Sequence, residues 1–242
     1  MRLRKTGWTA AAVLTLVLGA VAQTAGENAP PAGTNGPREG WGYVLVGLQN
    51  VGLSDLNGPM VSQGYSRFGE TFFSLGGGGM AIFGRLILGG EGYILFDRTS
   101  TRGPVQGRLG AGCGFFDLGY VFWQQDQFRA YALLGLGGGG WTLQLTDSAS
   151  VPLENVLATP GRASTLTTAG FMACLSVGAD WTARLGGGEG GEGAVSFGLR
   201  AGYALTPFKS QWKMRDFEIT PGTKMGLAGP FVRLVVGFGG RR

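Results

Sequence analysis

The sequence predicts an all-β fold, an antiparallel up-and-down β-barrel of eight strands. Glycine accounts for 48 of the 242 residues, which argues against helices because each interior glycine costs about 1 kcal/mol relative to alanine. The apolar content of 44% is too high for a disordered glycine-rich chain. The segments with strand character are 41–51, 71–83, 85–97, 105–123, 128–145, 166–182, 194–205 and 227–238.

The N-terminus is predicted to be a signal peptide, residues 1–22. Three basic residues precede a short apolar run, and Ala20-Val21-Ala22 fits the small-x-small cleavage pattern. The alternative, a single membrane anchor, needs a span of about 20 apolar residues, and this run is shorter. Cleavage lowers the formal charge from +5 to +2, since three basic and no acidic residues leave. No nucleic-acid partner is therefore expected.

The mature chain is expected to consist of a disordered lead-in, 23–39, and one domain, 40–242. The lead-in is rich in Pro, Gly and polar residues. In the domain, 166–182 alternates most clearly: Phe171, Leu175 and Trp181 share one face, and Ser176 and Asp180 share the other. Period-two alternation with one apolar face is the pattern of a strand between two different environments.

The predicted connections alternate in length. Those at 52–70, 146–165 and 206–226 are long, whereas those at Gly84 and 124–127 are tight. The connection at 98–104 is intermediate, and 183–193 is a longer exception. This sorting is typical of a transmembrane barrel with short periplasmic turns and longer outer loops. No segment after the signal peptide is long and apolar enough for a transmembrane helix, so a membrane location requires a closed barrel.

Aromatic residues gather near both ends of the predicted strands, as in the two aromatic belts of membrane proteins. Ordinary packing at strand ends is the alternative explanation. The lower belt is predicted to contain Trp41, Tyr43, Phe83, Tyr120, Phe122, Trp123, Tyr131, Trp181 and Phe238. The upper belt is predicted to contain Phe72, Phe96, Trp141, Phe171, Tyr203 and Phe231.

In these features the chain resembles the small eight-stranded outer-membrane barrels, the OmpA-like and OmpX-like group. The resemblance covers about residues 40–238 and includes a last strand that ends in Phe238, although four more residues follow it. It implies a monomer in the cell outer membrane. The partners it implies are the outer-membrane lipid, lipopolysaccharide as a candidate, and the outer-membrane assembly machinery.

Three glycine runs, 76–79, 89–92 and 137–140, raise the question of linkers. Apolar residues flank 137–140 with the alternation of a strand, so we interpret all three runs as strand segments. An eight-stranded barrel is just wide enough to be filled by side chains, and inward positions must often be small. We therefore expect these glycines to make room in the lumen.

Five charged residues are expected to point into the barrel and to form a lumen charge network: Glu91, Asp117, Asp180, Arg200 and Arg233. Charges in so narrow a space must pair, because an isolated buried charge is costly. The network is interpreted as a plug that holds the barrel closed. An ion pathway is the alternative, and it would need a continuous wet lumen.

Two further sets of residues carry predictions. The last long loop mixes cations and aromatic rings, which suits contact with anionic headgroups; its candidates are Lys209, Trp212, Lys213 and Arg215. A self-packed hairpin is the alternative for this loop.

Cys113 and Cys174 are predicted to be free thiols, because two strand spacings exceed the distance that a disulfide allows.

No catalytic, metal or cofactor site is predicted. The sequence has no histidine, which removes the usual general base near neutral pH and histidine-based metal ligation. The predicted function is that of an outer-membrane barrel with a structural or surface-interaction role and a closed polar lumen. The alternatives are a soluble exported barrel that binds a small apolar ligand, with its faces reversed, and a narrow channel.

Overall fold

The structure is a computed structural model that describes residues 38–147, 163–188, 191–208, 210–214, 217–218 and 224–241. The predicted signal peptide, the lead-in up to residue 37, Lys209 and Arg215 lie outside the described residues. Predictions about them therefore stay predictions. Among the described residues no helix is long and apolar enough to cross a membrane.

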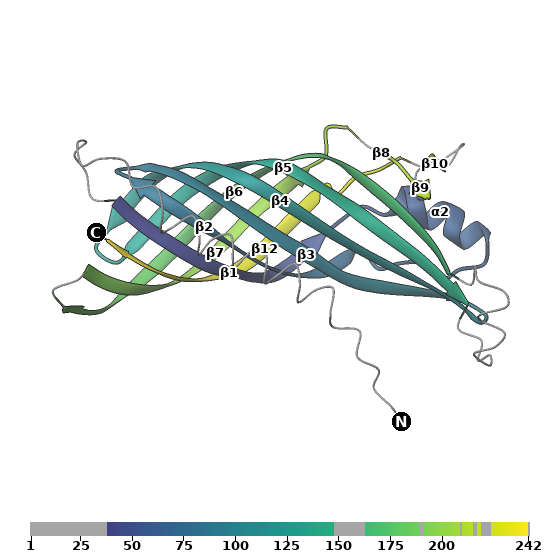
Figure 1. Cartoon of the computed structure of the whole chain (residues 1–242), viewed down its shortest axis with the longest axis horizontal. Helices are drawn as coiled ribbons and strands as arrows, with labels where there is room; N and C mark the ends of the chain where they lie inside the picture. The colour runs from purple at the N-terminus through teal and green to yellow at the C-terminus, as the bar shows by residue number, and fades with distance from the viewer. Residues whose placement is uncertain are drawn as a thin grey trace, which may run out of the picture.

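Eight long strands close into one antiparallel barrel, as Figure 1 shows. Each strand pairs with the next along the chain, and the last pairs with the first. This confirms the predicted up-and-down barrel. The strands are β1 (Arg38–Asn50), β2 (Thr71–Phe83), β3 (Leu86–Arg102), β4 (Val105–Gln125), β5 (Phe128–Asp147), β6 (Ala163–Gly188), β7 (Gly191–Leu205) and β12 (Gly229–Arg241).

The two ends of the barrel differ in their connections. At the end that holds the start of β1 and the end of β12, two residues separate each pair of consecutive strands. The long exception predicted at 183–193 is wrong, because β6 and β7 continue through most of it. At the other end, β3 and β4 extend to residues 102 and 105, so the connection predicted at 98–104 is also a two-residue turn. Longer strands thus replace both connections.

The opposite end carries α2 (Ser54–Ser62), which the sequence analysis did not predict. The same end holds four two-residue strands between β7 and β12: β8 (Ser210–Gln211), β9 (Lys213–Met214), β10 (Phe217–Glu218) and β11 (Lys224–Met225). In Figure 1, α2 and β8–β10 lie together at this end, far from the C-terminus. We call it the α2 end.

Four strands continue beyond the rest of the wall at the α2 end. The last β2–β3 pair is Ser74 with Leu95, and β7 ends opposite Ala173 of β6. Beyond the row that contains Leu95, only β3–β6 remain paired in long ladders. We call this part the sheet extension; it comprises residues 96–102, 105–110, 142–147 and 163–167.

The two faces of the wall are as predicted from the alternation. In β6, Phe171, Leu175 and Trp181 are exposed, whereas Ser176 and Asp180 are buried. Nine predicted belt residues stand outside: Phe83, Phe96, Tyr120, Phe122, Trp123, Phe171, Trp181, Tyr203 and Phe238. The prediction is wrong for six others, which are buried: Trp41, Tyr43, Phe72, Tyr131, Trp141 and Phe231. A position at a strand end sets the height of a residue in the barrel, but the phase of the alternation decides its face.

The interior contains an apolar cluster toward each end, and Glu91, Arg200 and Arg233 lie between the two clusters. The cluster at the α2 end includes Leu56 and Met60 of α2 together with Trp141, Met172 and Phe231. The other cluster includes Trp41, Ile82, Ile87, Tyr131 and Val235. The predicted polar lumen therefore holds buried charges packed against two apolar clusters, and these clusters were not predicted from the sequence.

All three glycine runs lie within strands, which confirms that they are not linkers. Inward glycines make room as predicted: a Cβ on Gly78 would lie 2.9 Å from Cζ of Tyr43, and one on Gly139 would lie 2.6 Å from Sδ of Met172. Their neighbours in sequence face outward instead. A Cβ on Gly92 or Gly138 would meet nothing closer than 3.4 Å, so lack of space in the lumen explains only alternate glycines of each run.

Candidate functional site

The strands bring the five predicted lumen charges into the interior, and all five are buried. Glu91 comes from β3, Asp117 from β4, Asp180 from β6, Arg200 from β7 and Arg233 from β12. The two arginines are the most enclosed, with 1% and 0% of their surface exposed. Each residue occupies the inward phase of its strand, which is what the alternation predicted.

Glu91 lies at the centre of the charged layer. Arg200 and Arg233 are direct cross-strand neighbours, and two like charges in that arrangement repel each other. Glu91 forms ion pairs with both: Oε2 with Nη1 of Arg200, and Oε1 with Nη1 of Arg233 at 3.4 Å. The hydroxyl of Tyr43 donates to the same carboxylate at 3.5 Å. One carboxylate thus holds the two buried guanidinium groups together.

Aromatic rings and an amide fix the Arg233 side chain. Its guanidinium carbon lies 3.6 Å from the centre of the Tyr93 ring and 3.9 Å from that of Phe231. Nη2 donates to Oε1 of Gln49 at 3.2 Å, and Gln49 in turn donates to the carbonyl of Leu227 at 3.2 Å. Cation–π contact and hydrogen bonding therefore both stabilise this buried charge.

A second set of ion pairs lies nearer the chain termini and involves Arg129, which the sequence analysis missed. Arg129 pairs with Asp180 at 3.0 Å and with Glu39 at 3.3 Å. The Tyr131 hydroxyl donates to Asp180 at 3.1 Å and accepts from Nη2 of Arg200 at 3.5 Å. The two sets are thereby connected. Arg129 has the same phase in β5 as Tyr131 and Leu133, which are both buried, and the assignment of Tyr131 to the outer belt concealed that signal.

Asp117 does not join these pairs. Its side chain is 4% exposed, and Oδ2 has no hydrogen-bond partner within the described part of the chain. The Nε atoms of Arg129, Arg200 and Arg233 are likewise buried without a partner there. The structure therefore brings four of the five predicted residues into ion pairs and leaves the fifth beside them. No group of three or more Cys, Asp and Glu side chains in the described ranges could hold a metal ion.

The two surface-loop candidates within the described residues differ in exposure: Trp212 is buried and Lys213 is exposed. Trp212 is 4% exposed and packs in the apolar cluster at the α2 end, so its prediction as a surface contact is wrong. The apolar inner face of the sheet extension needs a cover, and a large ring provides it. Lys213 is exposed on β9, where it pairs with Thr167 of β6.

Cys113 and Cys174 are free thiols, as predicted. Cys113 lies opposite Gly139 of β5 and Cys174 opposite Gly135. The two cysteines are therefore separated by two strand spacings and by four residues along β5. Four residues correspond to about 13 Å, which adds to the separation and places the pair well beyond disulfide distance.

Comparisons with known proteins give matches among solved structures but not among family models or curated proteins. No model of a protein family matches the chain, and no curated protein matches it. Among solved structures 11 chains match, including the crystal structure of Ail, the attachment invasion locus protein of Yersinia pestis. That match has 12% sequence identity and a TM-score of 0.31, and it covers 86% of this chain and 100% of Ail.

Proposed function

We propose that this protein is an outer-membrane β-barrel with a closed interior and a structural or surface-interaction role. The observation that carries the proposal is the outward face of the wall. Large apolar side chains stand exposed on all eight strands, at fractions that a water-exposed surface rarely shows over so large an area. Examples are Leu48, Phe73, Phe96, Phe116, Leu136, Leu175, Leu199 and Leu234, each between 43% and 60% exposed.

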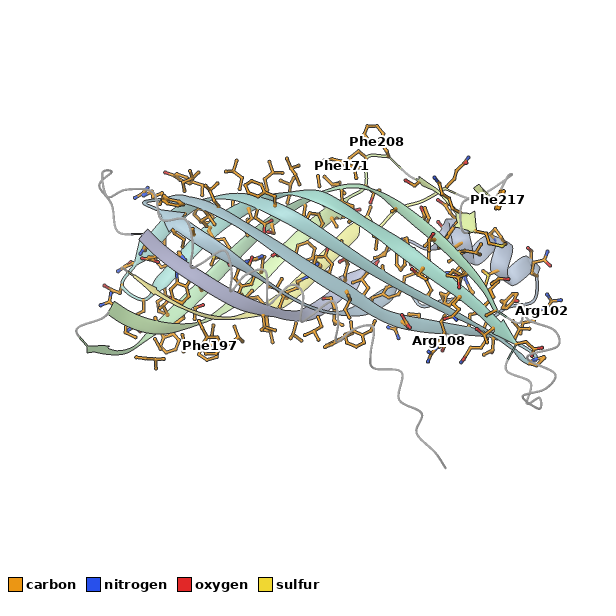
Figure 2. The ribbon with its side chains drawn as sticks, in the orientation of Figure 1. Arg102, Arg108, Phe171, Phe197, Phe208 and Phe217 are labelled. Atoms are coloured by element: carbon orange, nitrogen blue, oxygen red, sulfur yellow. The ribbon has the colours of Figure 1, made fainter. Side chains whose placement is uncertain are left out.

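Aromatic residues at two heights support a membrane location. Phe197 and Trp181 stack on the outside with ring centres 6.4 Å apart, and Phe197 lies toward the end opposite α2 in Figure 2. Phe171 stands on the outside nearer the α2 end. Aromatic rings favour the two membrane–water interfaces, so this spacing fits a band of lipid between them. The short turns then face the periplasm, and α2 faces outward from the cell.

The filled interior supports a structural or interaction role over conduction. An apolar cluster lies on each side of Glu91, Arg200 and Arg233, and the ion pairs of Glu91 with the two arginines cross the barrel between the clusters. Ions need a wet path, and apolar constrictions resist wetting. A soluble carrier of an apolar ligand needs the apolar face inside, and the exposed side chains do not support that alternative.

Gel mobility of the membrane-fraction protein in SDS, unboiled against boiled, tests the proposal. A closed barrel has no free edge, so we expect a folded band whose mobility changes only on heating. Protein found wholly in the soluble exported fraction would overturn the membrane location. Recordings in planar bilayers address the closed interior: we expect no conductance, and steady single-channel steps would favour the narrow channel instead.

A further inference from the structure

The outer face of the sheet extension differs from the wall below it. On the same four strands, Phe96 at the base of the extension and Phe116, Leu136 and Phe171 below it face outward in the apolar band. Above them the outward positions are polar and form rows that the strand register defines. One row contains Thr99, Arg108, Gln144 and Thr165. The adjacent rows contain Thr101, Gln106 and Thr146, and Gly110, Thr142, Thr167 and Lys213.

These rows form one continuous surface, because residues opposite one another in a ladder point to the same side of the sheet. The inward positions between them include Leu109 and Leu143, which are 0% and 2% exposed. The polar surface is therefore the outer side of the sheet extension. Along each of the four strands, the outward positions change from apolar in the band to polar in these rows. We call it the threonine face.

Arg108 is the cation at the centre of the threonine face. It is exposed, and it has no ion-pair or hydrogen-bond partner among the residues that the structure describes. Figure 2 shows it near the α2 end, on the outside of the barrel. Thr99 and Gln144 flank it on the two neighbouring strands. A guanidinium with hydroxyl and amide groups on both sides can bind an oxyanion and its neighbouring hydroxyls together.

Lys213 provides a second cation on the same face. It pairs with Thr167, so it lies three strand spacings, or about 14 Å, from the strand of Arg108. The carboxylate of Asp97 borders the face: a Cβ on Gly110 would overlap Oδ1 of Asp97, which places that side chain over Gly110. Glu218 of β10 is the register partner of Lys213, whereas Arg108 has Thr99 and Gln144 opposite it, so Arg108 is the cation of this face with no carboxylate opposite it in the ladders.

We propose that the threonine face binds the phosphorylated saccharide headgroups of glycolipids in the surrounding outer leaflet, with Arg108 as the main phosphate contact. The inference rests on the proposed outer-membrane location. It follows from the continuity of the face with the apolar band, because lipids that touch Phe116 and Phe171 have headgroups at the height of the rows above. The hydroxyls and amides then match sugar hydroxyls, and Arg108 matches phosphate.

The test compares Arg108→Gln with Arg102→Gln. Arg102 belongs to the same extension, but its guanidinium lies over the Tyr65 ring at 5.7 Å instead of on the threonine face. The full chain, purified from membranes, is reconstituted into phosphatidylcholine vesicles, and binding of labelled lipopolysaccharide is titrated. Loss of one charged contact predicts about tenfold weaker binding for Arg108→Gln. Arg102→Gln is expected to change the affinity less than twofold.

Further arms identify the headgroup. Lipopolysaccharide stripped of phosphate is expected to bind the unaltered protein about as weakly as intact lipopolysaccharide binds Arg108→Gln. Thr99→Val combined with Thr165→Val, which keeps Arg108, should weaken binding of both forms. Equal affinity for phosphatidylglycerol in place of lipopolysaccharide would show recognition of negative charge without the saccharide, and would overturn the inference.

The proposed function and this inference fail in different ways. A chain that does not enter vesicles of any composition contradicts the membrane location and removes the basis of the inference. A chain that inserts normally but binds lipopolysaccharide equally with Gln or Arg at position 108 leaves the membrane location intact and overturns the inference alone.

Discussion

The guanidinium group of Arg233 lies between two aromatic rings, 3.6 Å from the centre of Tyr93 and 3.9 Å from that of Phe231. Both rings belong to the apolar cluster at the α2 end. Arg233 also pairs with Glu91 in the charged layer. This side chain therefore joins the two parts of the interior, and it is 0% exposed. The charged layer and the apolar cluster are one packed unit at this point.

Replacing Arg233 should consequently be costly. Arg233→Ala removes one of the two guanidinium partners of Glu91 and leaves a space between the two rings. Loss of one partner of a buried pair typically costs about 3–5 kcal/mol. We expect a loss of that size in urea unfolding of the barrel from phosphatidylcholine vesicles. Arg108→Ala is the matched control, since Arg108 is exposed, and it should change stability by about 0.5 kcal/mol or less.

The charged layer should also show coupling between Glu91 and Arg200. Each single change, Glu91→Gln or Arg200→Gln, leaves a buried charge short of a partner. The double variant removes both charges at once, so its loss of stability should be smaller than the sum of the two single losses. For residues in contact we expect a coupling energy of about 1–3 kcal/mol in the same unfolding assay. Additive losses would mean that the two side chains do not interact in the folded barrel.

The sequence was sufficient to predict the barrel and the direction of its faces. Strict alternation in segments such as 166–182 fixes which residues share a face, and the charged residues identify which face is inside. Ser176 and Asp180 are buried opposite exposed Phe171 for this reason. The same logic placed Glu91, Arg200 and Arg233 inside, although it could not show that one carboxylate pairs with both arginines. That pairing depends on how β3 is positioned across the barrel from β7 and β12. In the sheet, β3 is a neighbour of neither strand.

The α2 end could not be predicted in the same way. Its helix contains Gly58 and Pro59, and residue 53 before it makes no side-chain capping bond, so local signals for a helix are weak. Leu56 and Met60 are held there because the apolar inner face of the sheet extension needs a cover. Trp212 was misjudged for the same reason. Its loop has the composition of a surface contact, and only the three-dimensional need for a cover turns the ring inward.

Glycines on the two faces of the wall should respond differently to a large side chain. A Cβ on Gly139 would lie 2.7 Å from Cβ of Cys113 and 3.0 Å from the carbonyl oxygen of Gly112. We expect Gly139→Leu to abolish the heat-modifiable band in SDS gels, because the lumen has no space for the side chain. Gly114 is an exposed glycine of β4, and a Cβ there would meet nothing closer than 3.7 Å. Gly114→Leu should keep the band, and a loss in both variants would contradict the assigned faces.

The composition of their loop indicates that Trp212 and Phe217 both act at the surface. We expect instead that Trp212 contributes to the stability of the barrel and that Phe217 does not. Trp212 is 4% exposed within the apolar cluster, whereas Phe217 is 77% exposed on β10. Truncation of a large buried ring typically costs about 3–5 kcal/mol, so Trp212→Ala should lower the urea concentration at which the barrel unfolds. Phe217→Ala should leave that concentration unchanged within about 0.5 kcal/mol of stability. If Trp212→Ala kept full stability and lost affinity for lipopolysaccharide, the ring would have to act at the surface, and the packing of the α2 end described above would be wrong.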